Sequence, residues 1–345
     1  MAARQEISDL LIGPAAGDLA PGAILIVIPD GMLHRLPFAL LHNGDQYLVD
    51  NHEVFLVPSL RTLHYLRARA RTLQEDNHQP DLDILAVGCS GDGDSLAGTS
   101  LRLHPFTDNP IPSLPHADRE AKLVAGLFSN ALVLTGARAS EASLKESPLG
   151  TAGILHIAAH SFADEEDIGR SFIVMNLPGD EPDNPTASLQ DGLLQWHEVV
   201  ALQLRASLVT LASCRSAGGV LAYGEGITGL TQAFLFAGGN SVLATLTDVP
   251  DRFAARLMIG FYRYLRRGMS AAGALRAVQK EAMTWEDART NQALWASFVL
   301  VGDGTVTVQR SGNLILYLSI VGIFVLLGLL VTATRKMRRK RSRKI

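Results

Sequence analysis

Two apolar runs of strand length, each ending just before a reactive side chain, constrain the fold of this chain more than any other feature. The first covers residues 154–159 and precedes His160, and the second covers residues 208–212 and precedes Cys214 by two positions. Such runs, followed by small and polar residues, are typical of buried strands in a parallel sheet. Ligands bind at the carboxyl ends of strands in open α/β sheets, so the pattern predicts that His160 and Cys214 meet at one sheet edge.

A thiol beside an imidazole is a simple nucleophile and base pair, because the imidazole accepts the thiol proton and stabilises the thiolate. A buried cysteine is also a common core residue, and a histidine at a strand end is often structural, so the residues alone leave both interpretations open. Cys89, which follows a predicted strand at 82–88, is a second candidate nucleophile without a basic partner motif. His197 is a rival imidazole in a helix-like polar segment, which favours a structural role.

Helix-like and strand-like segments alternate ahead of His160. The predicted elements are a helix at 60–73, a strand at 82–88, a helix at 115–128, a short strand at 133–134 and a helix at 139–147 capped by Ser140. This alternation is typical of a doubly wound parallel sheet, so the predicted fold class is α/β.

Composition and charge exclude several classes of protein. At 345 residues and 47% hydrophobic the chain can bury a core, and at 19% charged it does not resemble a disordered chain. Of the formal charge of −3, residues 335–345 contribute +8 and the remainder −11. The acidic remainder is a poor candidate for binding nucleic acid. The two cysteines, far apart in sequence, indicate neither a disulfide framework nor a zinc site.

Residues 314–333 contain no charged side chain over twenty positions. At about 1.5 Å per residue, this length spans the roughly 30 Å hydrocarbon core of a bilayer. The sequence therefore predicts a transmembrane helix at 312–334, a basic tail at 335–345 and a single-pass protein of the cell membrane. The tail favours a cytoplasmic carboxyl terminus, whereas residues 1–23 contain no secretory signal that would export the preceding domain. Either the domain is cytosolic, which we favour, or an upstream export segment is missing from the sequence.

Four segments in a fixed order resemble the CHAT domain family, a bacterial branch of the caspase and separase group of cysteine peptidases, clan CD. They are PDGMLHRLPFALL at 29–41, DGLLQWHEV at 191–199, YGEGITGLTQAFLFAGG at 223–239 and WASFVLVGD at 295–303. The resemblance covers nearly the whole chain ahead of the predicted membrane span. It implies a caspase-like three-layer sandwich with a mostly parallel sheet, made of a β-rich part at 1–80 and a catalytic part at 81–308.

The same resemblance implies a cysteine peptidase in which Cys214 attacks a peptide carbonyl and His160 transfers the protons. It places the oxyanion donor at the main-chain N–H near Ser161, and it implies no cofactor and no metal. Asp248 and Asp251 resemble an acidic run of separases, where a carboxylate pocket accepts a basic residue. Such a carboxylate would select Arg or Lys by charge pairing, although helix capping explains an aspartate here equally well.

The predicted function is therefore a membrane-anchored, caspase-like cysteine endopeptidase that cleaves protein or peptide substrates, with a regulatory protein partner. An alternative is a catalytically silent CHAT-type module that binds a protein partner at the membrane. Ser161 stands where the family usually has glycine, and Thr247 stands where it commonly has tryptophan, and both leave room for that alternative. A cysteine hydrolase acting on small amides would use the same site.

Overall fold

The computed structural model describes most of the chain ahead of the predicted membrane span. The described residues are 2–43, 45–76, 79–91, 112–164, 167–177, 191–212, 220–222 and 226–308. Cys214 and the predicted membrane span at 312–334 lie outside these ranges. Within the ranges, every helix is too short or too polar to cross a lipid bilayer.

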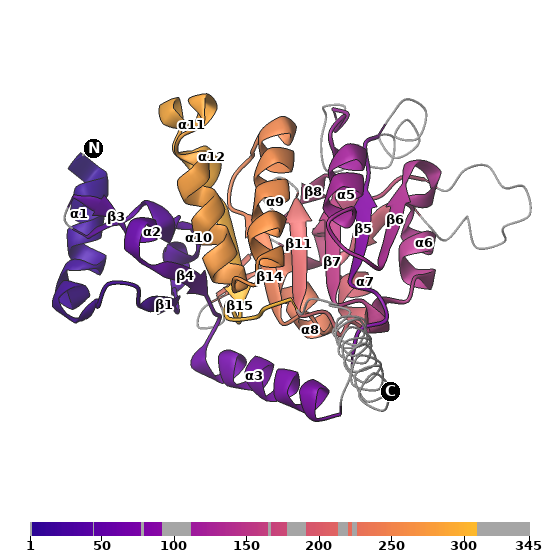
Figure 1. Ribbon diagram of the computed structural model, residues 1–345, viewed down its shortest axis with the longest axis horizontal. Coiled ribbons are helices and arrows are strands. Elements are labelled where there is room, and N and C mark those ends of the chain that lie inside the picture. Colours follow the sequence, from indigo (N-terminus) through magenta and orange to yellow (C-terminus); the bar gives the residue numbers. More distant parts are fainter. Residues whose placement is uncertain are drawn as a thin grey trace, which may run out of the picture. The chain divides into compact units, whose positions relative to one another are not determined.

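An eight-stranded sheet runs through the compact unit formed by Met1–Val308 (Figure 1). In spatial order its strands are β1 (Ile24–Val27), β4 (Glu53–Leu56), β15 (Phe298–Gly302), β14 (Ser241–Thr245), β11 (Leu208–Ala212), β7 (Ile154–Ala158), β5 (Ile84–Gly88) and β6 (Ala131–Thr135). Every neighbouring pair is parallel except β14 and β15, which are antiparallel. The predicted α/β class with a mostly parallel sheet is confirmed.

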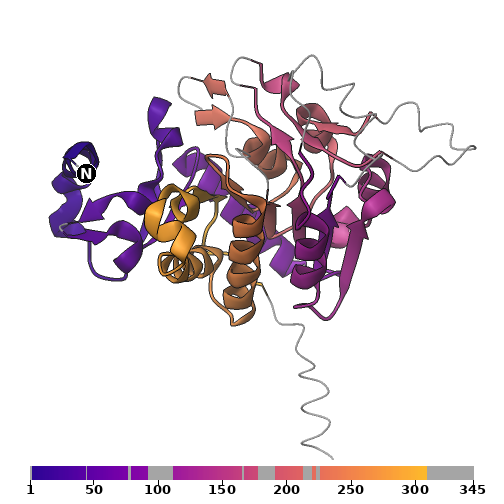
Figure 2. The same ribbon diagram turned by 90° about the horizontal axis from the view of Figure 1, so that it is seen from above.

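Helices cover both faces of the sheet, which explains why its central strands are apolar along their whole length (Figure 2). The helices α5 (Ala117–Ala125), α9 (Asp251–Arg266) and α10 (Ala271–Ala282) pack into one hydrophobic core. The helices α6 (Glu141–Glu146), α7 (Trp196–Ala201) and α8 (Leu230–Ala237) pack into the core on the other face. Alternate residues of β7 and β11 belong to the two cores, as the period of a strand requires.

The amino-terminal part is less rich in strands than the sequence predicts. Its elements are α1 (Ala2–Leu11), η1 (Gly13–Asp18), η2 (Gly31–Arg35), η3 (Phe38–Leu40), the hairpin of β2 (His42–Asn43) and β3 (Gln46–Tyr47), α2 (Leu48–Asn51) and α3 (Leu60–Glu75), besides β1 and β4. The segment after Pro29 forms two short 3-10 helices because prolines at 29 and 37 lack the N–H that a strand ladder needs.

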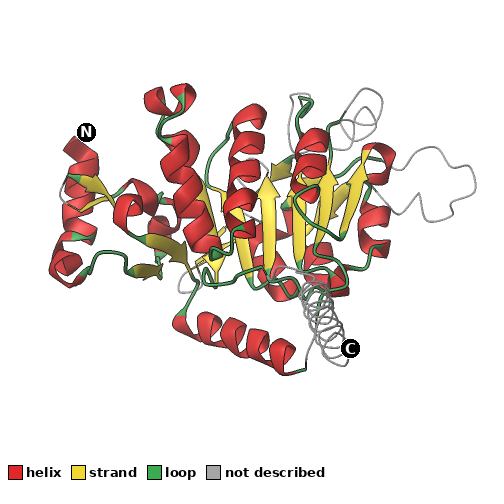
Figure 3. Cartoon of the chain, viewed as in Figure 1, coloured by secondary structure: helices red, strands yellow, loops and turns green. Residues whose placement is uncertain are grey.

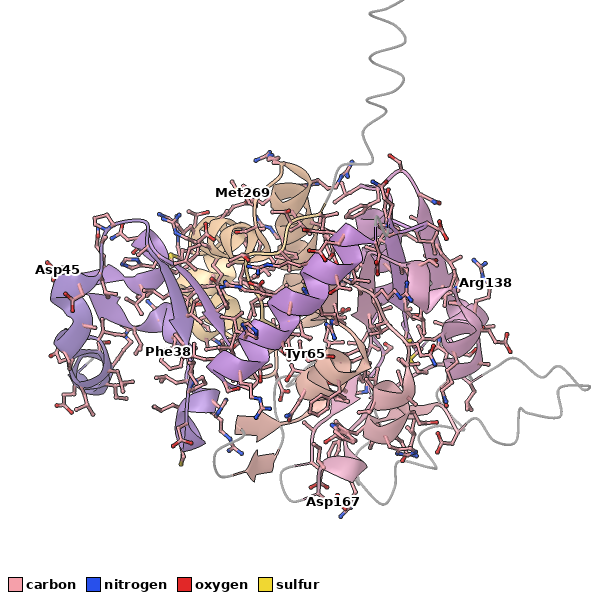
Figure 4. The ribbon with its side chains drawn as sticks, turned by 90° about the horizontal axis from the view of Figure 1, so that it is seen from below. Phe38, Asp45, Tyr65, Arg138, Asp167 and Met269 are labelled. Atoms are coloured by element: carbon pink, nitrogen blue, oxygen red, sulfur yellow. The ribbon has the colours of Figure 1, made fainter. Side chains whose placement is uncertain are left out.

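The helix predicted at 60–73 is confirmed as α3, which begins where the Ser59 hydroxyl accepts a hydrogen bond from Thr62 N at 3.0 Å. Figure 4 shows α3 with the labelled Tyr65, whose side chain is exposed. The guanidinium of Arg69 donates to Asn240 Oδ1 at 2.9 Å and so ties α3 to the segment between α8 and β14. The predicted parts 1–80 and 81–308 belong to one unit, because β15 lies between β4 and β14.

Smaller elements complete the unit and are coloured by type in Figure 3. They are η4 (Gly136–Arg138), η5 (Leu149–Thr151), η6 (Ile168–Arg170), the antiparallel sheet of β8 (Ser161–Phe162), β9 (Phe172–Val174) and β10 (Leu193–Gln195), the hairpin of β12 (Val220–Ala222) and β13 (Gly226–Thr228), α11 (Glu286–Thr290) and α12 (Ala293–Ala296). The small sheet of β8, β9 and β10 begins directly after His160. The predicted cap of α6 is confirmed, since the Ser140 hydroxyl accepts a hydrogen bond from Ser143 N.

Candidate active site

The two strands that the sequence singles out are neighbours. β7 and β11 run parallel, and their register pairs Ala158 with Ala212. His160 and Cys214 each follow these paired residues by two positions. The prediction that both strands end at the same sheet edge is confirmed, and it places His160 there. Cys214 itself lies outside the described residues.

A main-chain carbonyl fixes the ring of His160. Nε2 of His160 lies 2.7 Å from the carbonyl oxygen of Pro112, in the segment that leads into α5. A carbonyl oxygen only accepts hydrogen bonds, so Nε2 carries the proton of this contact. In the neutral ring Nδ1 is then left as the proton acceptor, which is the tautomer that a general base needs. Pro112 O thus orients the imidazole, a role the sequence does not reveal because every residue has a carbonyl.

Two opposing effects act on the pKa of His160. Burial of the ring lowers the pKa, and the Pro112 carbonyl and the charge of Asp251 raise it, with a net lowering. A lowered pKa keeps the imidazole neutral at pH 7, so that it is ready to accept a proton from a thiol.

A small pocket lies against His160 at the carboxyl ends of β7, β11 and β14. Its lining residues are Leu114, Ala159, His160, Ala212, Thr245, Val249, Asp251 and Ala254. Asp251 is the first residue of α9, and its Oδ2 accepts a hydrogen bond from His116 N at 2.8 Å. Asp248 is exposed and does not line the pocket. Of the two predicted substrate-binding carboxylates, the structure therefore brings Asp251, and not Asp248, to His160.

Ser161 opens strand β8 and faces Ile173 of β9 across the small sheet. The carbonyl of His160 accepts a hydrogen bond from Val174 N at 2.8 Å. This bond fixes the main chain at the exit of β7, so the backbone next to the histidine has a defined course. The predicted oxyanion donor near Ser161 stays a prediction.

The two rival residues lie in structural settings. Cys89 is buried, its Sγ lies 3.5 Å from Ala139 O, and burial raises the pKa of its thiol to about 12. Such a thiol is protonated at pH 7 and is a poor nucleophile. His197 is an exposed residue of α7 and lines a groove at the amino-terminal ends of β7 and β11, the sheet edge opposite to His160.

Comparison with curated proteins finds a human relative and a mouse relative, both called tetratricopeptide repeat protein 28. The human protein is 27% identical over 331 residues, which cover 86% of this chain and 13% of that protein. The mouse protein is 26% identical over 332 residues, with the same coverage of both chains. This chain therefore spans about an eighth of the length of the relatives it matches.

Two solved structures resemble the fold of this chain over most of its length. A structure of the Saccharomyces cerevisiae separase–securin complex has a TM-score of 0.46 at 17% identity and covers 80% of this chain and 15% of that chain. A complex of the pro- and mature domains of Porphyromonas gingivalis RgpB has a TM-score of 0.49 at 12% identity and covers 90% of this chain and 70% of that chain.

The family model for the CHAT domain matches residues 2–303, which include every strand of the eight-stranded sheet and the whole pocket beside His160. The segments that resemble this family in sequence lie inside the match. The chain belongs to the CHAT domain family.

Proposed function

We propose that the protein is a caspase-like cysteine endopeptidase with Cys214 as nucleophile and His160 as general base. The observation that carries the proposal is the orientation of His160, whose Nε2 is held by Pro112 O at the end of the strand next to the one that leads to Cys214. The neutral imidazole and the shared register of the two strands are what a thiol–imidazole pair requires.

In the proposed reaction, Nδ1 of His160 takes the thiol proton and the thiolate of Cys214 attacks the carbonyl carbon of the substrate. The tetrahedral intermediate collapses as the C–N bond breaks, and His160 returns the proton to the leaving amine. The same imidazole then takes a proton from water, which attacks the thioester carbonyl carbon. The C–S bond breaks, the acid is released, and His160 returns the proton to the Cys214 thiolate. The main-chain N–H near Ser161 is the proposed oxyanion donor, and one such donor contributes about 3 kcal/mol to the stabilisation of the transition state.

We propose further that substrates carry Arg or Lys before the cleaved bond. Asp251 supports this preference, because its carboxylate lines the pocket beside His160 and only its Oδ2 accepts a hydrogen bond from the described residues. A guanidinium or ammonium group entering the pocket would pair with the other oxygen. Peptides that differ only in this residue, Arg, Lys or norleucine, measure the preference, and equal cleavage of all three would refute it.

Membrane anchoring is also part of the proposal, and the uncharged residues 314–333 support it. Val325→Arg combined with Leu326→Arg places two charges in the middle of the segment, at a cost of about 3 kcal/mol each. The native chain is expected to stay with membranes during an alkaline wash, and the double variant is expected to be released. Release of the native chain together with the double variant would refute membrane anchoring. A separate measurement, the accessibility of the domain to protease in sealed vesicles, reports on which side of the membrane the domain lies.

The test of the peptidase uses the purified full chain, Cys214→Ala and His160→Ala with a mixed peptide library. Cleavage by the native chain alone supports the proposal. Equal cleavage by native chain and Cys214→Ala would exclude Cys214 as the nucleophile. Absence of cleavage by all three proteins would favour the catalytically silent module that binds a protein partner, and hydrolysis of small amides without protein cleavage would favour the small-amide hydrolase.

A further inference from the structure

Four buried polar side chains form a chain of contacts beneath the candidate active site. Glu120 Oε1 lies 3.3 Å from His156 Nε2, and His156 Nδ1 lies 2.7 Å from Thr210 Oγ1. The Tyr262 hydroxyl lies 2.6 Å from the same Thr210 oxygen. All four residues are at most 2% exposed, so their polar atoms depend on one another for partners.

One arrangement of protons satisfies the contacts between His156 Nδ1, Thr210 and Tyr262. The Tyr262 hydroxyl donates to Thr210, and the Thr210 hydroxyl donates to Nδ1 of His156. Nε2 of His156 lies at ion-pair distance from Glu120 Oε1, and this contact lacks hydrogen-bond geometry. Burial raises the pKa of the Glu120 carboxyl, the contact with His156 lowers it, and Asp251 and His116 add smaller opposing effects. Burial likewise raises the pKa of Tyr262, which stays a hydrogen-bond donor.

The four side chains come from four elements that meet at the candidate site. His156 and Thr210 are paired residues of β7 and β11, and each lies four positions before a residue of the proposed dyad. Side chains two positions apart on a strand point to the same face, so His156 and Thr210 share a face with Ala158 and Ala212. Those two alanines pack into the core of α5 and α9, and Ala212 also lines the pocket beside His160. The contacts of this buried chain therefore connect the two strands on the face that α5 and α9 cover.

The outer members attach two helices to these strands. Glu120 belongs to α5, and the segment that leads into α5 presents Pro112 O to His160. Tyr262 belongs to α9, whose first residue is Asp251. The hydrogen bond from His116 N to Asp251 joins the two helix starts. The group that orients His160 thus comes from the segment leading into α5, and the group that adjusts its charge comes from the start of α9, and the buried contacts hold both helices in place.

We propose that Glu120, His156, Thr210 and Tyr262 act as positioning residues, which hold α5 and α9 so that Pro112 O and Asp251 stay on His160. The proposal rests on the proposed Cys214–His160 dyad. These residues do not touch substrate, and their effect on the reaction passes through the orientation of the imidazole. Loosening the helices would release Nε2 from Pro112 and let the ring leave the tautomer that accepts the thiol proton.

The test measures alkylation of Cys214 by iodoacetamide as a function of pH in the full chain, since this reaction reports the thiolate and needs no substrate. Tyr262→Phe, Thr210→Val and Glu120→Gln change single polar groups with little change in volume. Each is expected to move the pH midpoint of alkylation toward that of an ordinary thiol and to lower kcat about tenfold with little change in KM. Thr210→Ser keeps the hydroxyl and is expected to restore the native profile.

Tyr264→Phe is the matched control, because Tyr264 lies on the same helix and its hydroxyl donates to Glu281 Oε2 on the surface at 3.0 Å. Its alkylation profile is expected to equal that of the native chain. Native-like midpoints in all three buried variants, with a perturbed midpoint in the native chain, would overturn the positioning role and leave the dyad standing. An ordinary thiol midpoint in the native chain would overturn the dyad and the positioning role together.

Discussion

Asp251 lies in the same pocket as His160, and its charge raises the pKa of the imidazole against the burial that lowers it. The aspartate is held there by His116 N, so its position does not depend on a bound substrate. The charge of this carboxylate therefore influences the pKa at which His160 could act as a base.

Replacing Asp251 by asparagine removes that charge and is expected to lower the pKa of His160 further. Because the neutral imidazole is the proposed base, the acidic limb of the profile of kcat/KM against pH is expected to move to lower pH. Asp248→Asn, at an exposed position outside the pocket, is the matched control and leaves the limb in place. Equal shifts in both variants would show that the effect does not come from the pocket.

The two cysteines are expected to differ sharply in reactivity. The raised pKa of Cys89 keeps its buried thiol protonated. Iodoacetamide at about pH 7.5 is therefore expected to modify the native chain once, at Cys214. Denatured chain is modified twice, and mass spectrometry of the digested protein identifies the sites. Cys89→Ala is expected to retain full peptidase activity. Modification of Cys89 in the folded chain would contradict its structural role.

Gly238 ends α8 with φ of +121°, and a Cβ at this position would overlap the carbonyl of Leu204. Gly238→Ala is expected to lower the free energy of unfolding by about 3 kcal/mol, from backbone strain and steric overlap together. Gly268 also has a positive φ but has open space around its Cα, so Gly268→Ala is expected to cost only about 1 kcal/mol. Urea unfolding compares the two, and equal losses would exclude the overlap with Leu204.

Glu141 makes stability depend on pH. Its carboxylate and that of Glu198 share the ammonium of Lys145, and burial raises the pKa of Glu141 from 4.5 to about 7 while Lys145 opposes the shift. The folded state therefore binds this proton more tightly than the unfolded chain does. The resulting stability is fully present below pH 4.5 and is lost as the pH rises through 7.

Glu141→Gln is expected to flatten the decline of the free energy of unfolding between about pH 5 and pH 7. Glu146→Gln changes an exposed glutamate of the same helix and is expected to leave the decline unchanged. Thermal unfolding at several pH values provides the comparison. A native-like slope in Glu141→Gln would mean that other groups cause the decline.

The sequence predicts the strands of the sheet better than it predicts the contacts that orient the side chains at their ends. The runs ending at His160 and Cys214 are apolar because helices cover both faces of the sheet, and this pattern is local in the chain. The contact of Pro112 O with His160 joins residues 48 positions apart through a main-chain atom, for which no residue type is a signal.

Some side-chain partners can be predicted from the sequence, and others cannot. Asp248 and Asp251 are equivalent in the sequence, and only the start of α9 decides which one reaches the pocket. The buried contacts of His156 do leave a trace, because a histidine in the middle of a fully apolar strand needs polar partners from elsewhere in the fold. The sequence thus predicts that His156 has a polar partner, but it does not identify that partner.

The place of β15 between β4 and β14 also sets the order in which the protein can be completed during synthesis. Roughly 240 residues separate β4 from β15, which a ribosome needs about 12 to 50 seconds to add at ordinary rates. Throughout this time β1 and β4 have no bridge to the rest of the sheet, and β14 has an open edge from its own synthesis until β15 is added. A nascent chain that stops between Thr245 and Phe298 therefore exposes two unpaired strand edges to its neighbours on the polysome.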